Sequence, residues 1–255
     1  MKVVSVYNVK GGVGKTTCAV NLAFLAARDG YTTLLWDLDP QGGATFYLTE
    51  QTELARSPRK ILSKKSALLD AVIPTPYRDL FLLPADLSLR NVTILLDEMK
   101  RSRERIHEQL EKIGDRYDLV LLDAPPGLSL LSENLFSASD RILLPLVPTP
   151  LSLRAYLQIS AFFSEHDLPA EKILPFFNMV DRRKKIHRTT LEEYSRLPEF
   201  LSAWIPQASV VEEMGKRRKP LPAFSRTTTA SLAFLRLWEE LKRNVGLIRD
   251  TDRGT

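Results

Sequence analysis

The sequence has a single cysteine, Cys18, among its 255 residues. One thiol cannot form a disulfide within the chain, and it cannot supply the several thiolates of a metal or iron–sulfur site. Long apolar runs are also missing, since none approaches the roughly 20 residues that a membrane-spanning helix requires. We find no signal-peptide pattern after Met1 and no low-complexity tract. These absences predict a cytoplasmic, globular protein.

Both signs of charge are present, with a slight excess of positive charge. Charged residues make up 26% of the chain, and the net charge of +5 corresponds to a pI near 9.3. Many globular proteins have such values, so only local clustering of lysine and arginine would indicate a nucleic-acid partner. The three histidines, His107, His166 and His187, are scattered without metal-ligand spacing, and we expect them at the surface.

Short apolar runs alternate with longer helical stretches along the chain. The runs predict strands at 2–8, 31–39, 80–85, 117–126, 141–148 and 173–180, with a short one at 203–206. Helices fit at 16–30, 87–113, 129–138, 151–165, 187–197, 208–215 and 229–245. This alternation is typical of an α/β fold, with a doubly wound, mostly parallel sheet and helices on both faces. We expect one domain over residues 1–255, with a disordered polar tail at about 247–255.

Apolar residues within these elements indicate where the core lies. In the helix at 229–245, the stripe expected to face inward consists of Leu232, Leu235, Trp238 and Leu241. Trp36, in the second predicted strand, is expected to pack into the core as well.

Residues 7–17, YNVKGGVGKTT, nearly match the P-loop pattern G-x-x-x-x-G-K-[ST], but Val9 replaces the first glycine and Lys10 follows it. A glycine-rich turn between a strand and a helix directs free backbone N–H groups at a bound phosphate. Lys15 would reach the β- and γ-phosphates, and the Thr16 hydroxyl would bind Mg²⁺. The predicted phosphate-binding residues are Gly11, Gly12, Val13, Gly14, Lys15, Thr16 and Thr17.

Acidic residues end two of the predicted strands. Asp123 closes the apolar run LVLLD, as a Walker B aspartate does, and Asp37 and Asp39 close the run at 31–39. Because the carboxyl ends of parallel strands meet at one edge of a sheet, we expect these side chains near the phosphate loop. Thr16 and Asp123 are the metal-binding residues that this pattern predicts.

Three segments, KGGVGKTT (10–17), DLDPQGGAT (37–45) and LVLLDAPPG (119–127), resemble the ParA/MinD family of deviant-Walker P-loop ATPases. The segments FNMVDRR (177–183) and IPQASVVEEMGKRRKPL (205–221) are similar to ParA-type segments in the same order, so that the resemblance covers nearly the whole chain. It implies a P-loop NTPase fold, ATP and Mg²⁺ as cofactors, and a hydrolysis of ATP to ADP and phosphate that is slow without a partner.

The resemblance also explains the second lysine of the loop. Lys10 occupies the position of the family's signature lysine, which reaches the ATP of a second subunit. Two identical chains would then enclose two nucleotides, and the cation supplied by each chain would stabilise phosphate charge only in the assembled dimer. The resemblance therefore implies a homodimer that forms with ATP.

Further residue roles come only from the resemblance. Asp39 would orient the attacking water, so that Lys10, Lys15 and Asp39 form the catalytic set, while Asp37 would organise Mg²⁺. The segments DPQGGAT and APPGLS would sense the γ-phosphate, with Gly42, Gly43 and Gly127 as pivots. At the other end of the nucleotide, Asn178 would contact the adenine edge and Pro206 would lie against the base.

Two basic clusters follow these motifs. They consist of Arg182, Arg183, Lys184, Lys185 and Arg188, and of Lys216, Arg217, Arg218 and Lys219. Such clusters suit the phosphate backbone of DNA, and no motif that reads bases accompanies them. Together with the resemblance, they predict non-specific binding to double-stranded DNA of the nucleoid. A ParB-like protein or cargo adaptor would then trigger hydrolysis and release, so that a plasmid, chromosome origin or protein assembly is positioned.

Three other functions would require features that can be compared with the sequence. A MinD-like, membrane-associated ATPase would need a basic amphipathic C-terminal helix, but Asp250 and Asp252 oppose anionic lipid, and we expect no membrane binding. An iron–sulfur reductase would need paired cysteines, which Cys18 alone cannot supply. A P-loop synthase acting on a small substrate stays open, although Lys10 and the basic clusters fit it poorly.

Overall fold

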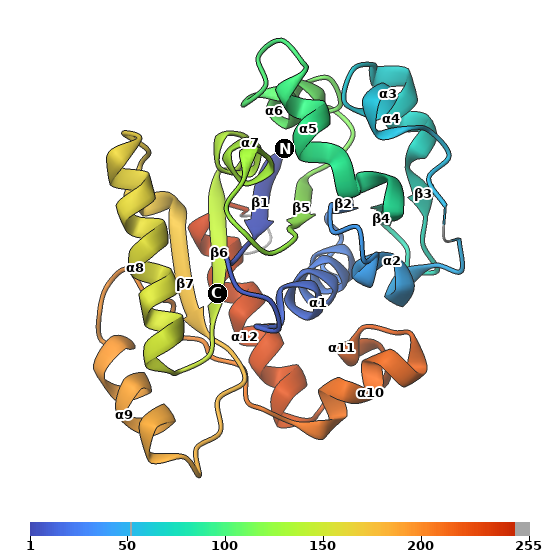
Figure 1. Ribbon diagram of the computed structural model, residues 1–255. Coiled ribbons are helices and arrows are strands. Elements are labelled where there is room, and N and C mark those ends of the chain that lie inside the picture. Colours follow the sequence, from blue (N-terminus) through green and yellow to red (C-terminus); the bar gives the residue numbers. More distant parts are fainter. Residues whose placement is uncertain (52, 248–255) are drawn as a thin grey trace.

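Seven strands form one sheet in the computed structural model, which describes residues 1–51 and 53–247. The strands are β1 (Lys2–Val6), β2 (Thr33–Asp37), β3 (Ile73–Pro74), β4 (Leu80–Leu83), β5 (Leu119–Asp123), β6 (Arg141–Leu146) and β7 (Ile173–Phe177). They lie in the order β3-β4-β2-β5-β1-β6-β7 (Figure 1). Every neighbouring pair is parallel except β3 and β4. The predicted doubly wound, mostly parallel sheet is therefore confirmed.

Helices cover both faces of this sheet, as predicted. They are α1 (Lys15–Arg28), α2 (Gly43–Leu48), α3 (Pro58–Ile61), α4 (Lys65–Ala71), α5 (Val92–Asp97), α6 (Arg105–Glu111), α7 (Leu130–Ala138), α8 (Pro150–Glu165), α9 (Lys185–Tyr194), α10 (Ser209–Arg217), α11 (Leu221–Phe224) and α12 (Thr229–Asn244). One apolar core joins the sheet to α5, α6, α7 and α8, and a second joins it to α1 and α12. The central strands β2 and β5 are buried along their whole length, because helices pack on both sides of them.

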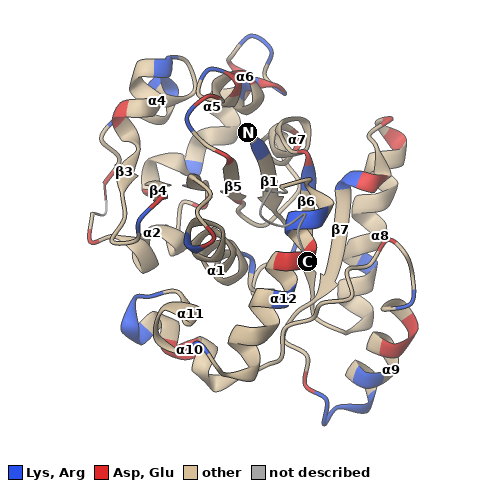
Figure 2. Ribbon diagram, turned by 180° about the vertical axis from the view of Figure 1, so that it is seen from behind, with Lys and Arg blue, Asp and Glu red and all other residues tan. Residues whose placement is uncertain are grey.

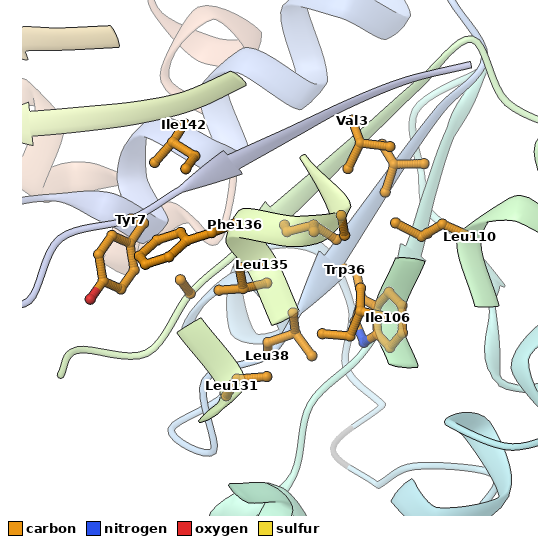
Figure 3. Close-up of a cluster of buried hydrophobic side chains, with 14 of the residues drawn as sticks. Val3, Tyr7, Trp36, Leu38, Ile106, Leu110, Leu131, Leu135, Phe136 and Ile142 are labelled. Atoms are coloured by element: carbon orange, nitrogen blue, oxygen red, sulfur yellow. The ribbon is translucent and has the colours of Figure 1, made fainter. Parts of the chain in front are cut away.

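Figure 3 shows part of the first core. Tyr7 and Phe136 meet edge to face with ring centroids 4.9 Å apart, and Trp36 lies among Ile106 and Leu110 from α6. Trp36 is 2% exposed, so its predicted role in core packing is confirmed.

Two predicted elements differ from the structure. The helix expected at 87–113 is divided into the 3₁₀ helix η1 (Leu87–Asn91), α5 and α6, and the turn between α5 and α6 contains Arg101 with a φ of 53°. A left-handed residue cannot continue a right-handed helix, which explains the break. The segment 203–206 does not form a regular strand, although it makes an isolated bridge between Val180 and Pro206 and a backbone hydrogen bond of 2.9 Å from the Ile205 N–H to the Phe177 carbonyl.

The predicted apolar stripe of α12 is partly wrong. Leu232 is 43% exposed and Leu235 is half-buried, whereas the buried apolar residues are Ala230, Ala233, Phe234, Leu237, Trp238 and Leu241. Steps of three residues drift around a helix with 3.6 residues per turn, so Leu232 and Leu241 lie about 180° apart on it. The buried residues follow steps of three and four, which stay on one face.

Two further expectations need correction. His187 was expected at the surface, but it is buried, and its Nδ1 accepts a hydrogen bond of 3.0 Å from the Asp181 backbone N–H. Leu247 was expected in the polar tail, but it is buried, and its carbonyl accepts a hydrogen bond of 3.1 Å from the Tyr31 hydroxyl. The remainder of that tail, 248–255, lies outside the described residues.

Candidate nucleotide-binding site

The glycine-rich loop joins the end of β1 to the start of α1, as its sequence predicts. Gly12 and Gly14 have φ values of 73° and 86°, a region that side chains with a Cβ seldom adopt. At Gly14 a Cβ would lie 2.3 Å from the Asn178 side-chain nitrogen, so only glycine fits there. The loop thus places the N-terminus of α1, with its free N–H groups, at the carboxyl edge of the sheet.

Asn8 holds the start of this loop, a role that sequence reasoning missed. Its side chain is fully buried, and its Nδ2 donates a hydrogen bond of 2.9 Å to the Pro145 carbonyl on β6. Its Oδ1 accepts one of 2.9 Å from the Lys10 N–H. The only signal in the sequence was an amide directly after an apolar strand, because such a residue must find partners when it is buried.

Lys15 folds back over the loop, as predicted. It is 6% exposed, and its Nζ donates a hydrogen bond of 2.9 Å to the Lys10 carbonyl. Burial lowers the pKa of its ammonium group, and the nearby carboxylates of Asp123 and Asp39 oppose that shift. The cation is thus held inside the loop, where phosphate oxygens would approach.

Lys10 differs from Lys15 in its surroundings. Its backbone is fixed at both ends, by Asn8 and by Lys15, and it is only half-buried. Within the described residues its Nζ makes no hydrogen bond or ion pair. The chain therefore presents an ammonium group beside a phosphate loop that already contains its own lysine.

Asp37 and Asp123 lie side by side at the ends of neighbouring strands β2 and β5. Both are buried completely, and Asp37 accepts hydrogen bonds of 2.8 Å from the N–H and the hydroxyl of Thr45. Burial raises the pKa of Asp37 to about 6, while these Thr45 hydrogen bonds oppose the shift. Thr45 was not predicted, and its hydroxyl also accepts from the Ala85 N–H at 2.8 Å.

Neither carboxylate oxygen of Asp123 makes a hydrogen bond of good geometry to any described residue. Burial and the neighbouring Asp37 raise the pKa of Asp123 well above its ordinary value, although the nearby Thr16 hydroxyl lowers it. A buried carboxylate without a partner is costly, and a divalent cation would compensate it. Mg²⁺ characteristically uses one or two carboxylates and completes its shell with phosphates and water, so Thr16, Asp37 and Asp123 fit it. Among residues 1–51 and 53–247, no group of three or more His, Cys, Asp or Glu could hold a metal ion on its own.

The two segments expected to sense phosphate border this site. Asp39 accepts a hydrogen bond of 2.9 Å from the Gln41 N–H, and Gly42 begins α2 with a φ of 62°. At Gly43 a Cβ would lie 2.9 Å from the Thr16 methyl group, which brings α2 directly against the phosphate loop. Gly127, with a φ of 98°, accepts a hydrogen bond of 3.0 Å from the Tyr7 hydroxyl.

Comparison with known proteins shows to which family this phosphate loop and its acidic residues belong. The model of the AAA domain family matches residues 1–171. An uncharacterised protein of Methanocaldococcus jannaschii is 33% identical over 96% of this chain and 100% of its own, and Soj of Bacillus subtilis, a sporulation initiation inhibitor, is 29% identical over 95% and 99%. The chain belongs to the ParA/MinD family of P-loop ATPases.

Solved structures of this ATPase class share the fold. A variant of McdA from Cyanothece in complex with ATP has a TM-score of 0.80 at 19% identity and covers 98% of each chain. Cobyrinic acid a,c-diamide synthase of Mycobacterium smegmatis, with an ATP analogue and magnesium, has a TM-score of 0.77 at 25% identity over 95% of this chain and 94% of its own.

Of the two residues expected at the adenine, Asn178 lies beside the phosphate loop. Asn178 follows β7, is buried, and donates a hydrogen bond of 2.7 Å from its Nδ2 to the Val13 carbonyl. Pro206 forms its bridge with Val180, two residues further along. Asn178 is thus placed beside the phosphate loop, and the contact of both residues with a base stays a prediction.

Several predicted DNA-binding arginines of this ATPase have partners within the chain. Arg183 forms an ion pair of 2.9 Å with Asp181, and Arg188 donates to the carbonyls of Arg182 and Arg183. In the second cluster, Arg217 pairs with Glu213 at 2.9 Å, and Arg218 binds carbonyls of α2. In these two clusters, the exposed cations whose side chains make neither an ion pair nor a hydrogen bond to a described residue are Arg182, Lys184, Lys185, Lys216 and Lys219. Figure 2 shows the two clusters at separate places, one beside α9 and one at α10 and α11.

The lengths of the described helices also bear on whether any of them could cross a membrane. Within residues 1–51 and 53–247, no helix combines the length and the apolar character that a bilayer span demands.

Proposed function

We propose that this chain is a ParA-type positioning ATPase. ATP would join two copies into a sandwich dimer, the dimer would bind double-stranded DNA non-specifically, and an activating partner would stimulate hydrolysis and release. Repeated cycles would segregate or position a cargo such as a plasmid, a chromosome origin or a protein assembly. Membership in the family supports the ATPase cycle, and two relatives are named as chromosome partitioning proteins, ParA of Caulobacter vibrioides and ParA of Myxococcus xanthus.

The residues of the site suit the chemistry of that cycle. Bound Mg²⁺ would supply charge neutralisation of the β- and γ-phosphates. Lys15 and the N–H groups of the loop bind the phosphates, while Thr16, Asp37 and Asp123 hold the metal. Asp39, in the segment that leads to α2, would orient the attacking water. Hydrolysis without an activating partner should be slow, as expected for a switch of this family.

One observation carries the dimer proposal: the Lys10 ammonium group has no partner among the described residues, while Lys15 already occupies the loop. Because Lys15 already reaches the phosphates of the nucleotide bound to its own chain, Lys10 is not needed for those phosphates. Directed at the nucleotide of a second copy, Lys10 would make dimerisation depend on the triphosphate.

Replacement of Lys10 tests this proposal. Lys10→Ala should bind ATP with nearly unchanged affinity but remain monomeric with ATP in size-exclusion chromatography coupled to light scattering, and its turnover should fall at least tenfold. The control Lys112→Ala removes an exposed lysine remote from the loop and should dimerise like the original protein. A Lys10→Ala chain that dimerises and hydrolyses normally would falsify the proposal.

Two alternatives make different predictions. A MinD-like role needs an amphipathic segment after α12, but Leu247, one of its two bulky apolar residues, is buried against Tyr31. Co-sedimentation with anionic liposomes would support that role, and we expect none. For a synthase, ATP turnover would require a small substrate and would be insensitive to DNA and to a partner protein.

A further inference from the structure

Arg218, one of the predicted DNA-binding residues, contacts a different part of the protein. It follows α10 in a left-handed conformation with a φ of 49°. Its Nε donates a hydrogen bond of 2.8 Å to the Phe46 carbonyl, and a second guanidinium nitrogen donates to the Thr49 carbonyl. The guanidinium carbon also lies 4.7 Å from the centroid of the Phe46 ring.

These contacts satisfy the end of a helix. Phe46 lies in the last turn of α2 and Thr49 is its C-terminal cap, so both carbonyls belong to the groups that a helix leaves without intrahelical partners. A cation at a helix C-terminus is also favoured by the helix dipole, and a planar guanidinium group can reach two carbonyls at once. Arg218 is therefore held by α2 and is poorly placed to contact DNA.

The opposite end of α2 lies against the metal and phosphate residues. Thr45 donates two hydrogen bonds to Asp37, and Gly43 lies beside Thr16. A helix of six residues is about 9 Å long, so a shift of its first turn is carried to its last turn. Contacts at the nucleotide thus reach the carbonyls that Arg218 binds.

Arg218 is the bridge between α2 and the basic end of α10. Cavities of about 640 and 560 Å³ lie on its two sides, and Arg218 lines both of them. The other anchors of the α10 end lie on α1 rather than on α2, since Asn21 donates a hydrogen bond of 3.3 Å to the Met214 sulfur and accepts one of 2.8 Å from the Leu221 N–H. Figure 1 shows α10 and α11 lying beside α2, on the side away from α5 and α6.

We infer that Arg218 is a positioning residue that couples the nucleotide site to the second basic cluster. When Mg-ATP engages Asp37 and Thr16, α2 is repositioned, and Arg218 transmits that change to Lys216, Arg217 and Lys219. This inference rests on the proposed function, since it assigns to that ATPase the route by which nucleotide controls one DNA-binding surface.

Hydrogen exchange of residues 214–219, with and without Mg-AMPPNP, tests this route. In the original protein, Mg-AMPPNP should change exchange rates at the α10 end. In Arg218→Asn the change should disappear, because the short side chain cannot reach α2 while asparagine tolerates the left-handed backbone. Arg218→Lys, which retains one donor and the charge, should recover part of the response.

The neighbouring arginine provides a matched control. Arg217 carries the same charge in the same cluster but pairs with Glu213 on its own helix. Arg217→Ala should keep the exchange response and weaken DNA binding to a similar extent with and without nucleotide. Arg218→Asn should instead lower the ratio of DNA affinities with Mg-AMPPNP and with ADP at least fivefold.

The outcomes separate the inference from the proposed function. An α10 end that does not respond to Mg-AMPPNP in the original protein, or that responds equally in Arg218→Asn, would overturn the coupling even if the protein binds DNA. If the α10 end of the original protein responds to Mg-AMPPNP but the protein does not bind DNA, the coupling is supported. The DNA-binding part of the proposed function is then wrong.

Discussion

At the scale of single residues, the metal site contains two carboxylates that the chain by itself does not neutralise. Asp37 has hydrogen bonds from Thr45, whereas Asp123 is fully buried without a well-placed donor among the described residues. Burial of two acids at the ends of adjacent strands opposes the ionisation of both. In the protein without nucleotide, these two buried carboxylates lower the free energy of unfolding. The same two groups make the site complementary to Mg²⁺.

Replacement of Asp123 by asparagine should reveal this cost. At pH 7.5 without nucleotide, Asp123→Asn should increase the free energy of unfolding by about 1–3 kcal/mol, because it removes a fully buried carboxyl group whose burial and proximity to Asp37 are offset only in part by Lys15. Chemical denaturation measures the change, and Asp115→Asn, at an exposed site, should stay within about 0.5 kcal/mol of the original protein. The same Asp123→Asn chain should lose Mg²⁺-dependent nucleotide binding.

The difference in free energy of unfolding between Asp123→Asn and the original protein should depend on pH, because the pKa values of Asp37 and Asp123 are raised. A carboxyl group whose pKa is higher in the folded chain contributes stability below its unfolded pKa, near 4, and loses it as the pH rises through the folded pKa. For Asp37 the folded pKa is about 6, and that of Asp123 is also raised. The advantage of Asp123→Asn should therefore shrink as the pH falls from 7 to 5, and a constant advantage would contradict this explanation.

At the scale of elements, α12 shows how packing selects a helix face. Its buried side includes Phe234, Leu237 and Trp238, and the indole N–H of Trp238 donates a hydrogen bond of 2.6 Å to Asp29 at the end of α1. Tyr31 packs edge to face on the same indole ring, with centroids 5.9 Å apart. Leu232 lies on the other side of the helix, in solvent.

Two leucines of α12 should consequently differ in importance. Leu237→Ala should lower the free energy of unfolding by about 2–5 kcal/mol, because it opens a cavity in the core shared with α1. Leu232→Ala removes an equal volume from the surface and should change it by less than about 0.5 kcal/mol. Thermal or urea unfolding distinguishes them, and a loss at Leu232 as large as that at Leu237 would contradict the exposed position of Leu232.

At the scale of the whole molecule, the parallel sheet gathers distant segments at one edge. The loop after β1, Asp37 at the end of β2 and Asp123 at the end of β5 meet there because β1 and β2 both pair with β5. The two basic clusters lie apart from each other, beside α9 and at the end of α10 (Figure 2). If the proposed binding to DNA occurs, the contribution of each cluster can therefore be measured separately.

Paired lysine replacements test each cluster. If both contact DNA phosphates, Lys184→Ala/Lys185→Ala and Lys216→Ala/Lys219→Ala should each reduce the slope of log K against log salt by about two. Fluorescence anisotropy with a labelled duplex and Mg-AMPPNP measures the slope, and Lys100→Ala/Lys112→Ala is the charge-matched control. A pair that leaves the slope unchanged would exclude its cluster from the DNA-binding surface.

The sequence alone determined the features that depend on local patterns. Loop residues such as Gly14 and Lys15 have their chemistry fixed by neighbours in the chain, and Asp123 directly follows the apolar run that forms its strand. The period of the apolar residues likewise determined the α/β class and most strands. The order of these strands in the sheet was not predicted, because a local pattern does not specify which strands pair.

Only the tertiary structure decided which side chains have partners far away in the sequence. Asn8 with Pro145, Thr45 with Ala85, and Arg218 with α2 join residues 40 to 172 positions apart. A local pattern carries no information about such contacts, so the sequence did not indicate that Arg218 binds carbonyls at the end of α2. Composition could indicate that arginines are abundant near residue 218, but the folded chain determines which of them remain available for a partner.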